Sequence, residues 1–126
     1  VAGVRTADGR GFADARKLLR AGSVRFGGAG NTTLGVIATN ATLTKTAVTR
    51  VAQMAHDGYA RAISPVHTPV DGDLIFALAT NTRAGAVDVG VVGALAAEVM
   101  ADAIVRAVRQ ATGLPGIPAL RDLQRP

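Results

Sequence analysis

The 126-residue sequence contains no cysteine and only four Phe, Tyr or Trp side chains. Without cysteine, this chain can form no disulfide framework, no thiolate zinc site and no cysteine nucleophile. Since aromatic residues make up 3% of the chain, its core must consist mainly of Ala, Val, Leu and Ile. The longest apolar stretch, at about 87–108, is interrupted by Asp88, Glu98 and Asp102. It therefore predicts a buried helix of a soluble protein, and no membrane partner is expected.

The balance of hydrophobic and charged residues, 48% and 18%, is that of a folded domain. The length allows one domain at most. The first ten residues, VAGVRTADGR, contain neither the basic segment nor the apolar segment of a secretory signal. The expected localisation is cytoplasmic.

The chain is basic, with 14 Lys plus Arg against 9 Asp plus Glu. These cations lie mostly towards the two ends of the sequence, and no four of them are consecutive. A nucleic-acid surface needs clustered cations or stacking aromatic side chains. We therefore expect no nucleic-acid partner.

Residues 1–31 are rich in glycine and are predicted to be irregular, apart from a short helix over 12–21 that Gly22 ends. The segment Gly27-Gly28-Ala29-Gly30 predicts a flexible boundary. After it the pattern becomes strand, helix, strand, helix, which indicates a layered α/β fold. The tail after Gly113 is predicted to be irregular.

The expected strands begin near Thr33 and Asp73, and the expected helices cover 44–63 and about 87–112. Both strands are almost continuously apolar, which predicts cover on both of their faces. Apolar residues at helical spacing give each helix a predicted buried stripe. In the first helix this stripe comprises Val48, Val51, Ala52, Ala55, Tyr59 and Ala62, and in the second Val92, Leu95, Ala96, Val99, Ala103, Ala107 and Val108.

The junction Gly30-Asn31-Thr32-Thr33 precedes the first strand and allows several interpretations. It is compatible with a tight turn, whereas a phosphate-binding loop would need a lysine and a following helix. A third interpretation is self-cleavage, in which Thr32 Oγ attacks the Asn31 carbonyl and hydrolysis of the ester frees the Thr32 α-amine. This amine, with an ordinary pKa near 7.7–8.0, can act as base for the adjacent hydroxyl.

The segment Asp71-Gly72-Asp73 precedes the second strand. It is compatible with a turn or with a metal-binding Asp-x-Asp pair. In an extended segment, however, residues two apart project to the same side, so both carboxylates could face one target.

Two histidines and one lysine are further candidates. His56, on the first long helix, is expected to make a packing contact, and Lys45 to be solvated. His67 lies in the proline-containing loop close to Asp71, where either a plain loop position or an indirect role beside the carboxylates is possible.

A specific resemblance rests on four segments: Gly30 to Asn40 (GNTTLGVIATN), Ala55-His56-Asp57-Gly58, His67-Thr68 and Asp71 to Thr80 (DGDLIFALAT). Together they resemble the DmpA-type self-processing amidohydrolases, a family that includes L-aminopeptidase/D-amidases, β-aminopeptidases and nylon-oligomer hydrolases. The resemblance covers that family's small catalytic chain nearly end to end. It implies part of an αββα sandwich of the N-terminal-nucleophile type.

The resemblance also implies the roles of the site residues. Asn31–Thr32 would be the cleaved bond, Thr32 the nucleophile, and Asp71 and Asp73 the groups that orient its amine, with neither cofactor nor metal. Residues 1–31 would end an upstream large chain, and residues 32–126 would form the small catalytic chain.

The upstream chain would supply the oxyanion and pocket residues, so that the present chain alone is expected to be an incomplete enzyme. Its expected partners are that upstream chain, further copies of the processed heterodimer, and a small peptide or amide substrate. The alternative is an uncleaved assembly or ligand-binding module of the same fold.

Overall fold

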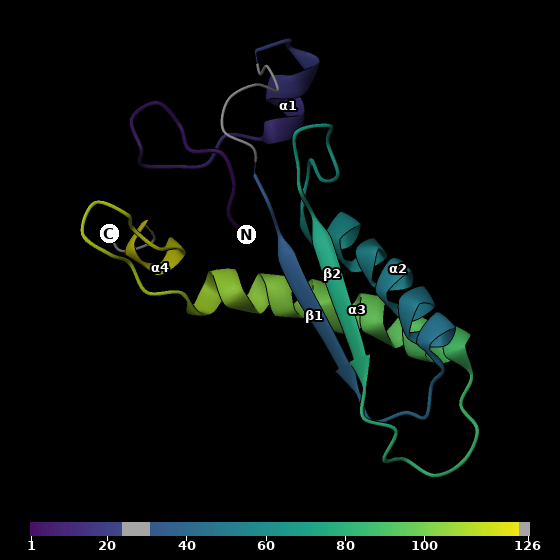
Figure 1. The fold of residues 1–126 in the computed structure, drawn as a ribbon. Coiled ribbons are helices and arrows are strands. Elements are labelled where there is room, and N and C mark those ends of the chain that lie inside the picture. Colours follow the sequence, from purple (N-terminus) through teal and green to yellow (C-terminus); the bar gives the residue numbers. More distant parts are fainter. Residues whose placement is uncertain (24–30, 124–126) are drawn as a thin grey trace. The chain divides into compact units, whose positions relative to one another are not determined.

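The computed structural model describes residues 1–23 and 31–123 (Figure 1). The expected flexible stretch from Gly27 to Gly30 lies outside these residues. The chain divides into two compact units, one formed by the described residues between Gly27 and Asp102 and the other by the remaining described residues at the two ends. Each unit is considered separately below.

The first unit is built around two parallel strands, β1 (Leu34–Thr39) and β2 (Leu74–Ala79). Leu34 pairs with Leu74, and the register continues without a bulge to the pair Thr39 and Ala79. Parallel neighbours require a crossover, which here contains α2 (Lys45–Ala62), packed against β2 (Figure 1). The predicted α/β class is confirmed.

Helix α2 begins where the sequence predicts. Thr44 is the N-cap, and its hydroxyl accepts a hydrogen bond from the Ala47 N–H at 3.2 Å. Val51, Ala55 and Tyr59 of the predicted stripe are buried. This stripe anchors α2 in the core of the unit.

Helix α3 (Val89–Gln110) also matches its predicted range, but of its predicted stripe only Ala96 is buried. Asp88 starts the helix by accepting the N–H groups of Gly90 and Val91 at 2.7 and 3.3 Å. The buried residues are Gly93, Ala96, Ala97 and Met100.

The predicted stripe residues Leu95 and Val99 are 54% and 55% exposed. The difference has a steric cause. A Cβ on Gly58 of α2 would collide with the Ala97 carbonyl oxygen and lie 2.7 Å from Met100 Cβ. The two helices therefore approach through their smallest residues, and the larger aliphatic side chains of α3 point elsewhere.

The expectation that both strand faces are covered is not met within the described residues. On one face Gly35, Ile37 and Ile75 are buried. The other face carries five exposed apolar side chains, Leu34, Val36, Leu74, Phe76 and Leu78. We call these five residues the open sheet face.

The second unit contains α1 (Ala15–Arg20), the end of α3 and α4 (Leu120–Leu123). Asp14 caps α1 by accepting the Arg16 N–H at 2.9 Å, and Gly22, with a φ of +65°, follows its end. The tail was predicted to be irregular, yet it contains α4 and a bridge between Leu114 and Ile117. No helix in the described part of the chain combines the length and apolarity that crossing a bilayer requires.

Candidate active site

The predicted site residues come together at the amino-terminal ends of β1 and β2. Asn31 forms a parallel bridge with Asp71, in the same register as the two strands. The Gly72 N–H donates to the Asn31 carbonyl at 2.9 Å, and the Leu74 N–H donates to the Thr33 carbonyl at 3.0 Å. The ladder of hydrogen bonds thus places the Asn31–Thr32 bond beside the Asp71-Gly72-Asp73 segment, although the two segments lie 40 residues apart in the sequence.

Thr32 is exposed, and its side chain lies over Gly72. A Cβ on Gly72 would be only 2.7 Å from Thr32 Oγ1, so a larger residue at position 72 would displace the hydroxyl. The register pairs Thr32 with Gly72, and alternate residues of a strand project to opposite sides. Glycine therefore leaves open the space that the Thr32 hydroxyl occupies.

Asp73 holds the residue that follows the predicted nucleophile. Its Oδ1 accepts the Thr33 N–H at 3.1 Å. Its Oδ2 accepts the His67 N–H at 3.3 Å and lies 2.8 Å from His67 Nδ1. The Asp73 side chain is only 6% exposed, and its three nitrogen neighbours supply the partners that a buried carboxylate needs.

These contacts determine the charge of Asp73. Burial is the largest single effect and raises the pKa of its carboxyl, whereas the backbone N–H groups of Thr33 and His67 lower it. The Thr33 side chain and the His67 ring lower the pKa further, so the net pKa lies below its ordinary value. Asp73 is therefore a carboxylate, and not a neutral acid, and it contacts Thr33, the residue that follows Thr32.

Asp71 has a different set of partners. Its Oδ2 accepts the Thr68 N–H at 2.8 Å, while its own N–H donates to the Thr68 carbonyl at 3.0 Å. The carboxylate thus closes the turn over residues 68–71. Among the hydrogen bonds of the described residues, none joins either carboxylate to Thr32 itself, so the orienting roles of Asp71 and Asp73 stay predictions.

Tyr59 is a neighbour of the site that was expected only as a core residue. It is fully buried, and its hydroxyl lies 3.2 Å from the Leu74 carbonyl oxygen and 3.3 Å from that of Thr33. Gly35 makes room for it, because a Cβ there would be 2.6 Å from the Tyr59 hydroxyl. One signal was available in the sequence: a tyrosine in an apolar stripe needs a polar partner for its hydroxyl.

The two histidines meet although they lie 11 residues apart in the sequence. His56 Nδ1 is 3.3 Å from His67 Nε2, and the His67 ring stacks on Tyr59 with 5.9 Å between ring centres. His56 was expected to make a packing contact and does so, against Tyr59 and His67. Lys45 is exposed, as expected.

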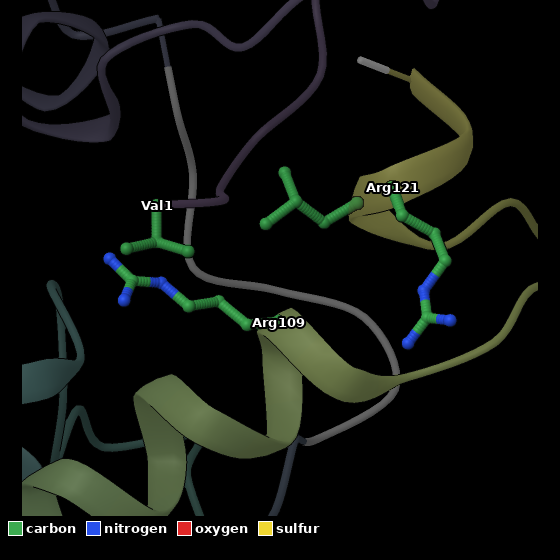
Figure 2. Close-up of a pocket in the computed structure, with 4 residues that line it drawn as sticks. Val1, Arg109 and Arg121 are labelled. Carbon is green, nitrogen blue, oxygen red and sulfur yellow. The ribbon is translucent and has the colours of Figure 1, made fainter. Parts of the chain in front are cut away.

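No three His, Cys, Asp or Glu side chains of the described residues are grouped as a metal site would require. In the second unit, Val1, Arg109, Leu120 and Arg121 line a pocket (Figure 2). The Arg109 side chain extends towards Val1, whereas that of Arg121 points away and donates to the Gln110 carbonyl (Figure 2). These four side chains offer neither a nucleophile nor a general base, so the strand ends are the better candidate for an active site.

The sequence is similar to those of a known protein family. The sequence profile of peptidase family S58 matches residues 3–120, which is most of the chain. An uncharacterized aminopeptidase of Mycobacterium tuberculosis is 45% identical over 74% of the chain, and one of Mycobacterium leprae is 46% identical over 70%. A 6-aminohexanoate-oligomer endohydrolase of Agromyces sp. is 37% identical over 63%.

The chain spans only part of these relatives. It covers 31% of the Mycobacterium tuberculosis protein, 28% of the Mycobacterium leprae protein and 25% of the Agromyces hydrolase. Each relative is therefore about three to four times longer than the segment that matches.

Proposed function

Because the chain belongs to peptidase family S58, we propose that it carries the nucleophile of a self-processing amide hydrolase and that this nucleophile is Thr32. The observation that carries the proposal is the arrangement at the strand ends. There the exposed Thr32 lies over Gly72, and the ionised Asp73 holds the next backbone N–H. The aminopeptidase and oligomer-hydrolase names of the relatives support an amide bond as the one cleaved.

Self-cleavage comes first in this proposal. Thr32 Oγ attacks the carbonyl carbon of Asn31, and the Gly72 N–H, 2.9 Å from that carbonyl oxygen, stabilises the charge that develops on it. The peptide C–N bond breaks, and the hydroxyl proton passes to the departing nitrogen, which leaves an ester. Water hydrolyses the ester to a carboxylate on Asn31 and a free amine and hydroxyl on Thr32.

Turnover then uses the new N-terminus. The Thr32 amine removes the proton of its own hydroxyl, Oγ attacks the substrate carbonyl, and water resolves the resulting acyl-enzyme. Nearby anions favour the protonated amine, so Asp73 and Asp71 orient this group and adjust its basicity. Short peptides and amides with a free amine are the proposed substrates.

The open sheet face supports the sandwich architecture and the upstream partner. Monomeric proteins rarely expose contiguous apolar patches of this kind. We assign its cover to a second sheet from the upstream large chain, which would complete an αββα sandwich and supply the missing pocket residues. Exposed Leu95 and Val99 on α3 would be covered between copies of the processed heterodimer.

The test is intact-mass analysis with N-terminal sequencing of the full-length protein. We expect a new chain that begins at Thr32, and amide hydrolysis by the cleaved material. Thr32→Ala should abolish cleavage and reduce kcat by about a thousandfold or more, because it removes the nucleophile. Thr32→Ser is the matched control, since it keeps a hydroxyl at the same position.

Two results would contradict this assignment: hydrolysis by Thr32→Ala, or an active protein in which the Asn31–Thr32 bond is intact. An uncleaved and inactive protein that still assembles would instead favour the non-catalytic module.

A further inference from the structure

Asp73 is held in place by a residue to which the proposed mechanism assigns no role. One of its carboxylate oxygens binds the Thr33 N–H, while the other binds both the backbone N–H and the ring Nδ1 of His67. The His67 ring therefore contacts the Asp73 carboxylate directly, and through that carboxylate it is connected to the Thr33 N–H, next to the proposed nucleophile.

The backbone at His67 is unusual. Its φ of +53° lies in the left-handed region, which non-glycine residues seldom adopt. Such a conformation costs free energy and persists only where the surroundings fix it. Here it directs both the backbone N–H and the ring of one residue at the same oxygen, Oδ2 of Asp73.

The ring is fixed from its other side as well. His67 Nε2 is 3.3 Å from His56 Nδ1, and the ring stacks on Tyr59. If His67 donates from Nδ1 to Asp73, its Nε2 has a free lone pair that can accept from His56. A His56 ring protonated at Nδ1 would donate to this lone pair and so favour the His67 tautomer that binds the carboxylate, as partner groups do for other functional histidines.

From this arrangement we propose that His67 is a positioning residue for the nucleophile, acting through Asp73 on the backbone of Thr33. The inference rests on the proposed role of Thr32. The ring prevents rotation of the Asp73 carboxylate, so that Oδ1 stays on the Thr33 N–H and Thr32 keeps its place beside Gly72. The titratable groups that face the His67 ring are Asp73, His56 and Tyr59.

The test compares two His67 variants that both tolerate a positive φ. His67→Asn keeps an N–H donor near the position of Nδ1. The Asp side chain of His67→Asp has nearly the same shape as Asn, but it presents a carboxylate that cannot donate when ionised. In the full-length protein we expect the Asp variant to lower kcat and the rate of self-cleavage at least tenfold, with KM changed less than threefold. The Asn variant should retain both rates within about threefold.

A double-mutant cycle with Asp73→Asn separates positioning from general loop stability. If His67 acts through Asp73, His67→Asp should cost less than threefold once Asp73→Asn is present, because coupled residues are not additive. Multiplicative losses would overturn the proposal, as would equal rates for the two His67 variants.

His67→Gly, which has no side chain and no strain at this φ, provides a second measurement. It should lose activity at least tenfold and regain part of it in added imidazole; wild-type rates in this variant would also overturn the proposal. Cleavage by Thr32→Ala would instead refute the proposed function, so the two failures are distinguishable.

Discussion

At the scale of single residues, Tyr59 connects the core to the candidate site. Its ring is fully buried, yet its hydroxyl reaches the carbonyl oxygens of Thr33 and Leu74, one on each side of the strand pair. The two carbonyl oxygens share the single hydroxyl proton, so one phenol contacts both strands where the Leu74 N–H already binds the Thr33 carbonyl. Burial raises the pKa of Tyr59, and the negative charge of Asp73 raises it further.

This raised pKa predicts a loss of stability in alkali. Below pH 10 the Tyr59 phenol is neutral in both states. Above that pH the unfolded chain loses the proton while the folded protein keeps it, so the contribution of Tyr59 to stability falls as pH rises through the folded pKa. We expect the free energy of unfolding to fall more steeply above pH 10 in the wild type than in Tyr59→Phe.

Denaturant unfolding between pH 8 and 11 would measure this difference, together with the phenolate absorbance that Tyr59→Phe removes. At pH 8, Tyr59→Phe should cost about 1 kcal/mol, the usual loss for a buried hydrogen bond. Parallel pH curves for the two proteins would show that the Tyr59 pKa is not raised.

Some contacts at the candidate site could be expected from the sequence and others could not, while the roles of Asn31, Thr32, Asp71 and Asp73 come from the family resemblance and stay predictions. The pair Asn31–Thr32 and the pair Asp71 and Asp73 are each recognisable as a short motif, and the strand register brings the two motifs together.

For His67 the sequence left open an indirect role beside the carboxylates, and the contact is with Asp73. The contact itself could not be specified, because it depends on a left-handed backbone conformation that the sequence does not impose on a histidine. The different partners of Asp71 and Asp73 were not predicted either: a local turn joins Asp71 to Thr68, whereas a tertiary contact joins Asp73 to Thr33.

At the scale of elements, α2 and α3 differ in how well their sequences predicted their packing. Thr44 and a single apolar stripe fixed both the start and the buried face of α2. Helix α3 is apolar on most sides, so its sequence offers more than one possible buried stripe. The prediction chose the stripe with the largest residues, and the structure buries another. Its orientation follows from glycine and alanine at the crossing with α2, which periodicity alone does not reveal.

This crossing predicts an unequal cost for two glycine substitutions. Gly58→Ala would place a Cβ against the Ala97 carbonyl oxygen and 2.7 Å from Met100 Cβ, atoms that cannot move without shifting the helices. Overpacking of this kind costs about 1–3 kcal/mol and outweighs the gain of roughly 1 kcal/mol in helix propensity. We expect Gly58→Ala to lower the unfolding free energy by up to about 2 kcal/mol, the difference between these two effects.

Gly93→Ala is the matched comparison on α3. Its Cβ would chiefly meet the thioether end of Met54, a flexible side chain that can move aside. Thermal and urea unfolding should therefore rank Gly58→Ala as the less stable of the two. Equal stabilities would mean that the helices can separate at little cost, contrary to the close crossing described here.

At the scale of the whole molecule, the open sheet face is the observation on which the proposed partner sheet rests. Val36 and Phe76 are 62% and 58% exposed on a surface that strands normally bury. Covering the exposed part of side chains of this size contributes about 1–2 kcal/mol each. A partner sheet from the upstream chain would supply this stabilisation and bring pocket residues towards Thr32.

A cysteine introduced on this face would report whether it is covered, since residues 1–126 contain no thiol and the protein without the introduced cysteine gives the background reaction. We expect the Val36→Cys variant of the full-length protein to react with a thiol reagent at least tenfold more slowly than Thr49→Cys, which lies on the exposed side of α2. In denaturant the two variants should react equally, because the protection comes from tertiary cover and not from the reagent. Equal rates in the native protein would show that the open sheet face remains in water, and the two-sheet architecture would then have to be abandoned even if Thr32 is the nucleophile.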